Sequence, residues 1–130
     1  MMPLARFAWN DYLLLAMEMR NMRSAPLREA VLRTVVGRAY YATFNQVIGW
    51  IRSDGFCPTG RSGDHAAIQE FLRTSGRRDT AELLRELRMM RNQCDYKDEV
   101  RDPESLAVMA IALAVEACGK WEPAGEMGEK

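Results

Sequence analysis

The stretch from residue 24 to residue 53, SAPLREAVLRTVVGRAYYATFNQVIGWIRS, limits the fold more than any other part of the chain. Ser24 and Pro26 suit the first turn of a helix, and no proline follows until Pro58. At about 100° per residue, the apolar side chains cover most of the circumference of this helix. We therefore expect it to form the centre of a bundle and, in part, to face a second subunit. The two opposite apolar sides comprise Leu27, Val31, Val35 and Ala42, and Tyr40, Phe44, Val47 and Ile51.

Length and composition indicate one domain in a reducing compartment. A chain of 130 residues can bury a core without disulfides, and an odd number of cysteines, three, argues for free thiols. With no visible signal peptide, we expect the protein in the cytoplasm. The run from residue 106 to 117 is too short to span a membrane. The 18 basic and 18 acidic residues balance, which removes the simple argument for bulk affinity for nucleic acid.

Hydrophobic periodicity predicts an all-α, up-and-down bundle of four long helices and one short helix. No segment has the period of two that a strand requires. Residues 1–121 would form this one domain, and residues 122–130 a polar tail. The long helix at residues 103–118, or 103–121, is apolar nearly throughout, so we expect it to be central. The other expected helices are 4–22, with Asn10 and Asp11 as an alternative later start, 24–53, 65–74 and 80–98.

Local sequence signals mark the ends of these helices. Within the first long helix, Tyr12, Leu15, Met19 and Met22 form the stripe expected to be buried. Mid-helix Gly37, close to two alanines, would allow another helix to approach closely. The expected caps and stops are Asp64 for the short helix and Gly76 for its end, the Asp79–Glu82 pair for the next helix, and Asp102 with Pro103 for the last.

Arg91 is the residue in the helix at 80–98 whose position most suggests chemistry. Leu83, Leu87, Met90 and Cys94 set the buried direction of that helix, and Arg91 projects close to it, whereas Arg85 and Arg88 point elsewhere. Asp95 follows one turn after Arg91, so the two can pair. The pair is either a structural ion pair that fixes helix register or part of a cleft or subunit interface that binds phosphate.

Four further side chains are weighed as candidates for a site. Arg38 shares a helix face with Leu27 and Val31, and adjacent Tyr40 and Tyr41 point about 100° apart, so at most one of them can face a given pocket. Core packing is the ordinary role of such tyrosines. His65 is the single histidine, and with scattered cysteines it does not provide the four clustered ligands of a zinc site. We therefore expect neither metal nor cofactor.

Three segments, taken in order, resemble the HEPN family. GRAYYATFNQ at 37–46, GDHAAIQEFL at 63–72 and LRELRMMRNQCDYKDE at 84–99 match the branch that carries A-Y-Y-A-x-F and R-x-x-x-D-Y. The resemblance covers residues 5 to 120. HEPN domains are small prokaryotic helical bundles that dimerise, and many bind or act on RNA or nucleotides. Some pair with a small nucleotidyltransferase in toxin–antitoxin or defence systems.

The resemblance also bears on catalysis. Ribonuclease members carry an arginine, a polar residue directly after it and then a histidine, with four to six residues between the arginine and the histidine. Arg91 and Asn92 match the first two, but Tyr96, Lys97 and Asp98 stand where the histidine belongs. The missing imidazole is the expected group for proton transfer.

The first functional expectation is therefore a dimeric module that binds RNA, a nucleotide or a nucleotidyltransferase partner. The alternative is a metal-independent ribonuclease toxin that uses Arg91, and a third reading is a purely structural dimer. The candidate catalytic residues are Arg91 and Asp95. The candidate binding residues are Arg38, Tyr41, His65, Arg88, Asn92 and Tyr96.

Overall fold

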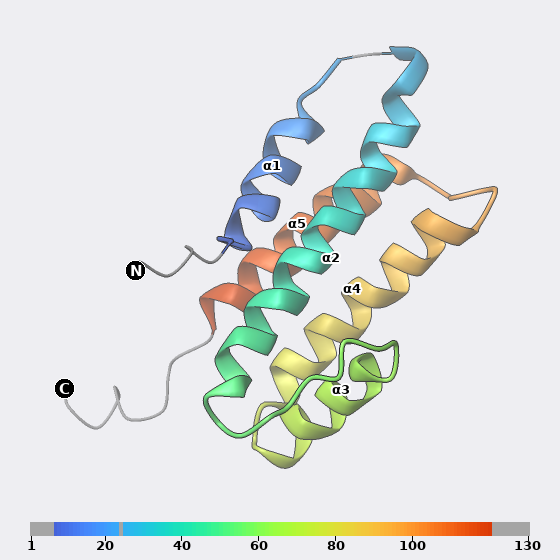
Figure 1. Ribbon diagram of the computed structural model, residues 1–130. Coiled ribbons are helices and arrows are strands. Elements are labelled where there is room, and N and C mark those ends of the chain that lie inside the picture. Colours follow the sequence, from blue (N-terminus) through green and yellow to red (C-terminus); the bar gives the residue numbers. More distant parts are fainter. Residues whose placement is uncertain (1–6, 24, 121–130) are drawn as a thin grey trace.

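The computed structural model describes residues 7–23 and 25–120. Within these residues the chain is all-helical, as predicted, and forms five α-helices and one 3₁₀ turn (Figure 1). The predicted tail at residues 122–130 and the expected helix start at residues 4–6 lie outside the described residues. The elements are α1 (Asn10–Arg20), η1 (Ala25–Leu27), α2 (Arg28–Arg52), α3 (Asp64–Thr74), α4 (Arg78–Tyr96) and α5 (Pro103–Gly119).

Helix α2 is the centre of the bundle. It packs against α1, α4 and α5, whereas the short α3 lies against α4 at the end where α2 leaves for the following loop (Figure 1). This arrangement confirms that a helix apolar on most of its circumference is covered on several sides. Its core residues include Val35, Val36, Ala39 and Val47. Leu27 is an exception: it precedes α2 and is 59% exposed.

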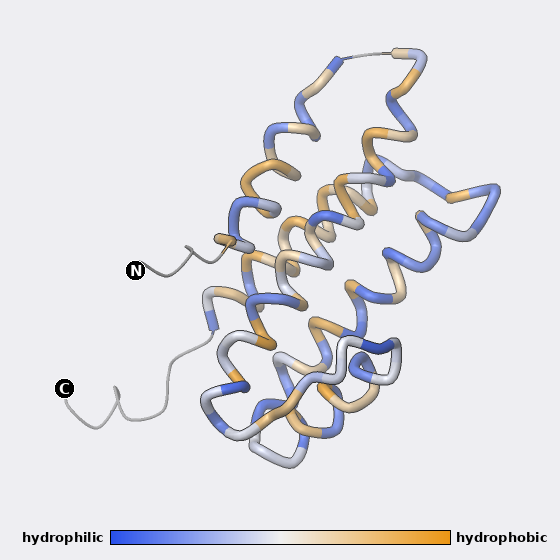
Figure 2. Tube along the Cα trace, viewed as in Figure 1, coloured by the Kyte–Doolittle hydropathy of each residue, from blue (hydrophilic) through white to orange (hydrophobic). Residues whose placement is uncertain are grey.

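The expectation that the last helix is central was wrong. Helix α5 buries a stripe of small side chains and leaves large apolar ones, among them Val108 and Val115, on the surface. Alanines at this spacing let α5 approach α2 closely, so high hydropathy here reflects one thin, close-packed face rather than burial all round. Figure 2 shows hydrophobic and hydrophilic segments alternating along the helices. The buried stripe is Ala107, Ala110, Ala114 and Ala117.

The buried face of α1 also differs from its prediction. The helix begins at Asn10, the alternative later start, and it buries Leu13 and Ala16. Tyr12 and Met19 are partly buried against the core, but Leu15 and Met22 are exposed. Because α1 has only 11 residues and one neighbour covers most of it, its contact stripe is narrower than the periodicity suggested.

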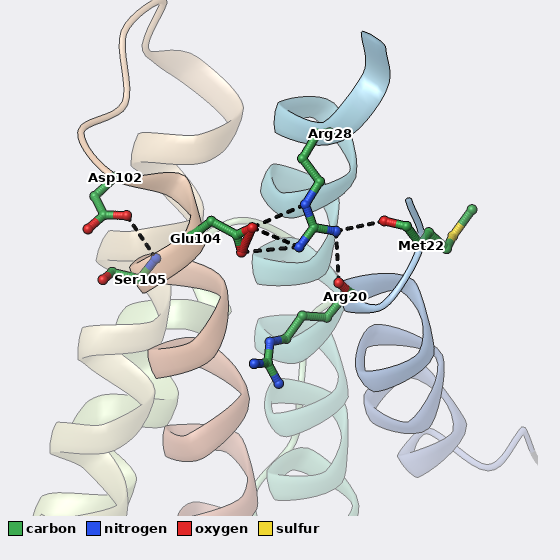
Figure 3. A network of polar contacts seen from close by, with 6 residues as sticks. All are labelled: Arg20, Met22, Arg28, Asp102, Glu104 and Ser105. Carbon is green, nitrogen blue, oxygen red and sulfur yellow. Dashed lines mark hydrogen bonds and ion pairs between the residues drawn. The ribbon is translucent and has the colours of Figure 1, made fainter. Parts of the chain in front are cut away.

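Arg28 joins the first helix, the second and the last (Figure 3). Its Nη1 donates to the carbonyl oxygens of Arg20 and Met22, both at 2.8 Å, and its Nη2 and Nε donate to Glu104. Carbonyl groups at the end of a helix lack partners within that helix, so a guanidinium is well suited to hold them. The continuous helix expected from residue 24 is thus a 3₁₀ turn followed by α2, and the predicted cap Ser24 lies outside the described residues.

The caps of the later helices were predicted with mixed success. Asp102 accepts from the backbone N–H of Ser105 at 3.1 Å and Pro103 opens α5, and Gly76 ends α3 with a φ of +83°, all as expected. The Asp79–Glu82 capping pair was wrong, because α4 already begins at Arg78, and α4 ends at Tyr96 rather than residue 98. Asp64 is the first residue of α3 rather than its cap.

Two further observations concern packing and length. A Cβ built on Gly37 meets nothing within 4 Å, so this glycine does not serve a close helix approach and that expectation was wrong. None of the helices in the described ranges is long and apolar enough to cross a membrane.

Candidate phosphate-binding cleft

One surface cleft gathers most of the polar side chains that the sequence singled out. Its volume is about 600 Å³, and it lies where the loop before α3, α3 itself and the last turns of α4 meet α2. We name it the α3–α4 cleft. The two helices and the loop come from distant parts of the sequence, and the packing of α3 on α4 brings them together. The residues that line it are Tyr41, Ser62, His65, Arg88, Arg91, Asn92, Tyr96 and Lys97.

Arg91 is held in the cleft by one carboxylate and two aromatic rings. Its Nε lies 2.8 Å from Oδ2 of Asp95, and its Nη1 donates to the side-chain oxygen of Asn92 at 3.1 Å. The guanidinium carbon lies 5.2 Å from the ring centroids of both Tyr41 and Tyr96. Its side chain is 16% exposed, against 39% for Asp95. A guanidinium fixed in this way is preorganised to meet an anion.

The lining of the cleft is positively charged. Arg88, Arg91 and Lys97 contribute three cations, and none of the lining residues is acidic. The Nε of Arg88 is buried and makes no hydrogen bond to the described part of the chain. Asp95 neutralises part of the charge of Arg91 but does not itself line the cleft. Cations with unused donors that converge on one cleft are suited to phosphate or carboxylate.

His65 reaches the cleft because α3 folds back over α4. Its Nδ1 is hydrogen-bonded to the hydroxyl of Tyr40, and its ring stacks on Phe44 with centroids 4.5 Å apart. Burial lowers the pKa of the imidazole below its ordinary value, and the charges of Arg88 and Arg91 lower it further, although Asp64 opposes them. The imidazole is therefore neutral at pH 7.

Asp64 fixes the loop that carries Ser62 and leads into α3. Its carboxylate accepts from the backbone N–H and the hydroxyl of Thr59, at 2.9 and 2.7 Å, and from the N–H of Gly60 at 2.8 Å. These hydrogen bonds from Thr59, and then from Gly60, hold the pKa of the carboxyl below its ordinary value. The carboxylate is thereby committed to the loop, and its neighbour His65 is positioned at the start of the helix.

Arg33 holds in place the end of α4 and the turn that follows it, which form one wall of the cleft. From α2, its guanidinium donates to the carbonyl oxygens of Lys97 at 2.6 Å, Asp98 at 2.9 Å and Cys94 at 3.2 Å, and its Nε donates to Glu29. The last carbonyl groups of α4 lack hydrogen-bond donors within the helix, and the guanidinium of this arginine supplies the missing donors. Arg33 therefore fixes the turn that presents Tyr96 and Lys97 to the cleft.

The structure brings together most of the predicted site residues. Tyr41, His65, Asn92 and Tyr96 line the cleft with Arg91. So does Arg88, a candidate binding residue that helical periodicity had placed on another face of the helix. Arg38 does not: its guanidinium lies 4.8 Å from the ring centroid of Tyr12, on the side of α2 that faces α1. Core packing was the ordinary role expected for Tyr40, and its hydroxyl contact with His65 could not be inferred without knowing where α3 packs. Ser62 gave no signal in the sequence.

The cleft has no metal-binding group among the residues that the structure describes, because histidine, cysteine and carboxylate side chains do not gather there in threes. Asp64 is engaged by its loop and Asp95 by Arg91. Comparisons of the chain with models of protein families, with curated proteins and with solved structures give no match.

Proposed function

We propose that the α3–α4 cleft binds a phosphate group of single-stranded RNA or of a nucleotide. The observation that carries this proposal is the charge of the lining: Arg88, Arg91 and Lys97 surround the cleft and no carboxylate lines it. Because the formal charge of the whole chain is zero, the excess of positive charge is a property of the cleft rather than of the whole surface. Arginine forks match phosphate oxygens, and the rings of Tyr41 and Tyr96 add faces on which a base can stack.

The HEPN resemblance supports the same proposal from the sequence. Its motifs include Tyr41, His65, Arg91 and Tyr96, all of which line the cleft. We extend the proposal to a dimeric HEPN-like module of a toxin–antitoxin or defence system, with a small nucleotidyltransferase as protein partner. A nucleotidyltransferase gene beside the gene for this chain, and co-elution of the two proteins after joint expression, would support that extension. Separate elution would contradict it.

The binding test compares two arginines one turn apart on α4. Labelled single-stranded RNA is titrated in EDTA, with fluorescence anisotropy as the measurement, for wild type, Arg88→Gln and Arg85→Gln. Arg85 is exposed and pairs with Glu82 outside the cleft, so it is a matched control for the loss of one positive charge. We expect Arg88→Gln to weaken binding about tenfold and Arg85→Gln to change it little, with affinity falling as salt rises. Equal effects of both substitutions would place the binding site outside the cleft.

A second candidate, metal-independent cleavage of RNA, is favoured by one observation. The sequence lacks the motif histidine, but α3 brings His65 to the same cleft as Arg91. A neutral imidazole beside a phosphate-binding arginine resembles a general base paired with a charge stabiliser. Incubation of labelled RNA in EDTA distinguishes the two functions. Binding without cleavage is the result expected for the first, and robust cleavage that disappears in both Arg91→Ala and His65→Gln would establish the second.

A further inference from the structure

We infer that Tyr40 fixes the imidazole of His65 in the tautomer that carries its hydrogen on Nε2, so that His65 meets a bound phosphate as a hydrogen-bond donor rather than as a base. The statement about the ligand rests on the proposed function, whereas the tautomer is a property of the free protein. In this inference Tyr40 is a positioning residue, because it acts only through His65.

The first step is the state of the Tyr40 hydroxyl. The side chain is 1% exposed, and the partner that the structure gives its hydroxyl is Nδ1 of His65. Burial raises the pKa of this phenol far above its ordinary value, although the nearby Arg88 opposes the change, so the oxygen keeps its hydrogen at neutral pH. A buried hydroxyl hydrogen needs an acceptor, and Nδ1 is the acceptor in reach.

The second step concerns the imidazole. If Nδ1 accepts the phenol hydrogen, it carries none of its own, and the ring hydrogen of the neutral form lies on Nε2. One face of the ring lies against Phe44, with 4.5 Å between centroids, and its Nδ1 edge meets Tyr40. With Nδ1 turned to α2, the polar ring atom left for the cleft is Nε2.

The charges around His65 favour the same state. Arg88 and Arg91 of α4 oppose protonation of the imidazole, whereas the carboxylate of Asp64 favours it and is committed to the loop. From α2, the groups beside His65 are the phenol of Tyr40, which keeps its hydrogen, and the side chain of Tyr41. A second proton on the ring would have to sit on Nδ1, which would turn the hydroxyl of Tyr40 from donor to acceptor and leave its hydrogen without that partner.

The consequence is a cleft lined by donors. The Nε2–H of His65 would join the guanidinium groups of Arg88 and Arg91 and the ammonium group of Lys97 around the phosphate oxygens. Removal of a proton from a 2′-hydroxyl needs a lone pair on Nε2, and in this tautomer that lone pair is replaced by the ring hydrogen. The geometry therefore favours binding over cleavage.

Nitrogen NMR can test the tautomer directly, because the chain has one histidine. Uniformly ¹⁵N-labelled protein, freed of any affinity tag, is recorded in long-range ¹H–¹⁵N spectra from pH 8 to pH 5, together with Tyr40→Phe and Tyr12→Phe. Tyr12→Phe is the matched control, since it removes a phenol hydroxyl from α1, away from the cleft. In wild type we expect Nε2 to have the shift of a protonated ring nitrogen and Nδ1 that of an unprotonated one.

In Tyr40→Phe we expect the two nitrogen shifts to move toward each other and the imidazole pKa to rise toward 6.5, its value in the absence of the fold, while Tyr12→Phe resembles wild type. A protonated Nδ1 in wild type, or averaged shifts that Tyr40→Phe leaves unchanged, would overturn the inference. Addition of inorganic phosphate at pH 7.5 separates the two proposals. A change at Nε2 that Arg91→Gln abolishes supports the donor role. If the Nε2 shift does not change, the donor role is wrong and the result counts against the proposed function. The tautomer of the free protein is tested separately, by the spectra recorded without phosphate.

Discussion

The unequal exposure of Arg91 and Asp95 predicts unequal effects when either residue is removed. Arg91 is the more buried partner, at 16% against 39%, and it lies near Arg88 and Lys97. Asp95→Ala leaves that guanidinium without its carboxylate among like charges, whereas Arg91→Ala relieves part of the repulsion. We expect Asp95→Ala to lower the free energy of unfolding by about 1 kcal/mol, since the pair is partly exposed, and Arg91→Ala to lower it by less. Urea unfolding measures both, and equal, negligible changes would mark the pair as an ordinary surface one.

His65 gives the stability of the protein a dependence on pH. Burial, Arg88 and Arg91 lower the pKa of the imidazole below 6.5 in the folded state, so the unfolded chain binds the proton more readily. This contribution of His65 to the free energy of unfolding is fully present above pH 6.5. It is lost as the pH falls through the lower pKa that the imidazole has in the folded protein. Urea midpoints at pH 7.5 and pH 5.5 should therefore differ more for wild type than for His65→Gln. The low pKa of Asp64 acts in a separate window, below 3.8, so it does not obscure this comparison.

At the residue scale, the sequence predicted the side of α4 that carries Arg91 but not the width of the cleft. Of the four residues predicted to set the buried direction, Leu87 and Cys94 are buried, but Leu83 and Met90 are only half-buried. Leu84, which was not among the four, is buried, so the buried face is rotated toward it. This rotation brings Arg88 to the cleft. Arg38 was misplaced for another reason: periodicity shows which residues share a face of α2, but only the packing shows which neighbour covers that face.

At the scale of the elements, replacing either of two glycines by alanine should change the free energy of unfolding, and the two changes should have opposite signs. Gly37 lies inside α2 with no atom within 4 Å of an added Cβ, whereas Gly76 ends α3 with a φ of +83°. Gly37→Ala removes backbone freedom from the unfolded chain, and we expect it to raise the free energy of unfolding by about 0.5–1 kcal/mol. Gly76→Ala forces an L side chain into a left-handed conformation and should lower it by about 1 kcal/mol. Thermal unfolding that gives both changes the same sign would contradict this account.

The loop before α3 depends on a single carboxylate. Asp64→Ala removes the acceptor shared by the Thr59 and Gly60 N–H groups and the Thr59 hydroxyl, which frees the segment that carries Ser62 and starts α3. We expect a lower melting temperature and weaker RNA binding, because His65 is then less well positioned. Asp54→Ala, an exposed residue at the other end of the same loop, is the control and should change neither. Unchanged RNA binding by Asp64→Ala would show that the loop does not shape the cleft.

The sequence predicted which segments form helices. It predicted the end of a helix, or its buried face, only where residues next to that point decide the outcome. Asp102 and Gly76 act through their own backbone geometry, so their roles were predictable. Asp64 was not, because its partner Thr59 lies in the preceding loop. The alanine face of α5 was misinterpreted because a run of small and large apolar residues has the same hydropathy whether the helix is enclosed or lies on one side of a bundle.

At the scale of the whole molecule, the bundle accounts for the apolar circumference of α2 without a second subunit. Val35, Ala42, Val47 and Ile51, which were assigned to its two opposite sides, are all buried against α1, α4 and α5 of the same chain. The exposed Leu27 is the exception. The original reason for expecting a homodimer is thereby removed, and the prediction has to rest on another surface.

Helix α5 supplies such a surface. Val108, Ala112 and Val115 recur at spacings of four and three residues on its outer side, all exposed, with Met109 beside them. An apolar stripe of this kind on a compact bundle is typical of a contact between subunits, and the twofold symmetry of a homodimer would place two such stripes together. We predict a dimer at micromolar concentration by light scattering. Val108→Glu with Val115→Glu should produce a folded monomer, since neither side chain contributes to the core of its own chain. Leu14→Glu with Leu15→Glu, the same kind of change at two exposed apolar residues of α1, should leave the dimer intact. A wild-type monomer at this concentration would refute the prediction, and a dimer that survives the double substitution would move the interface away from α5.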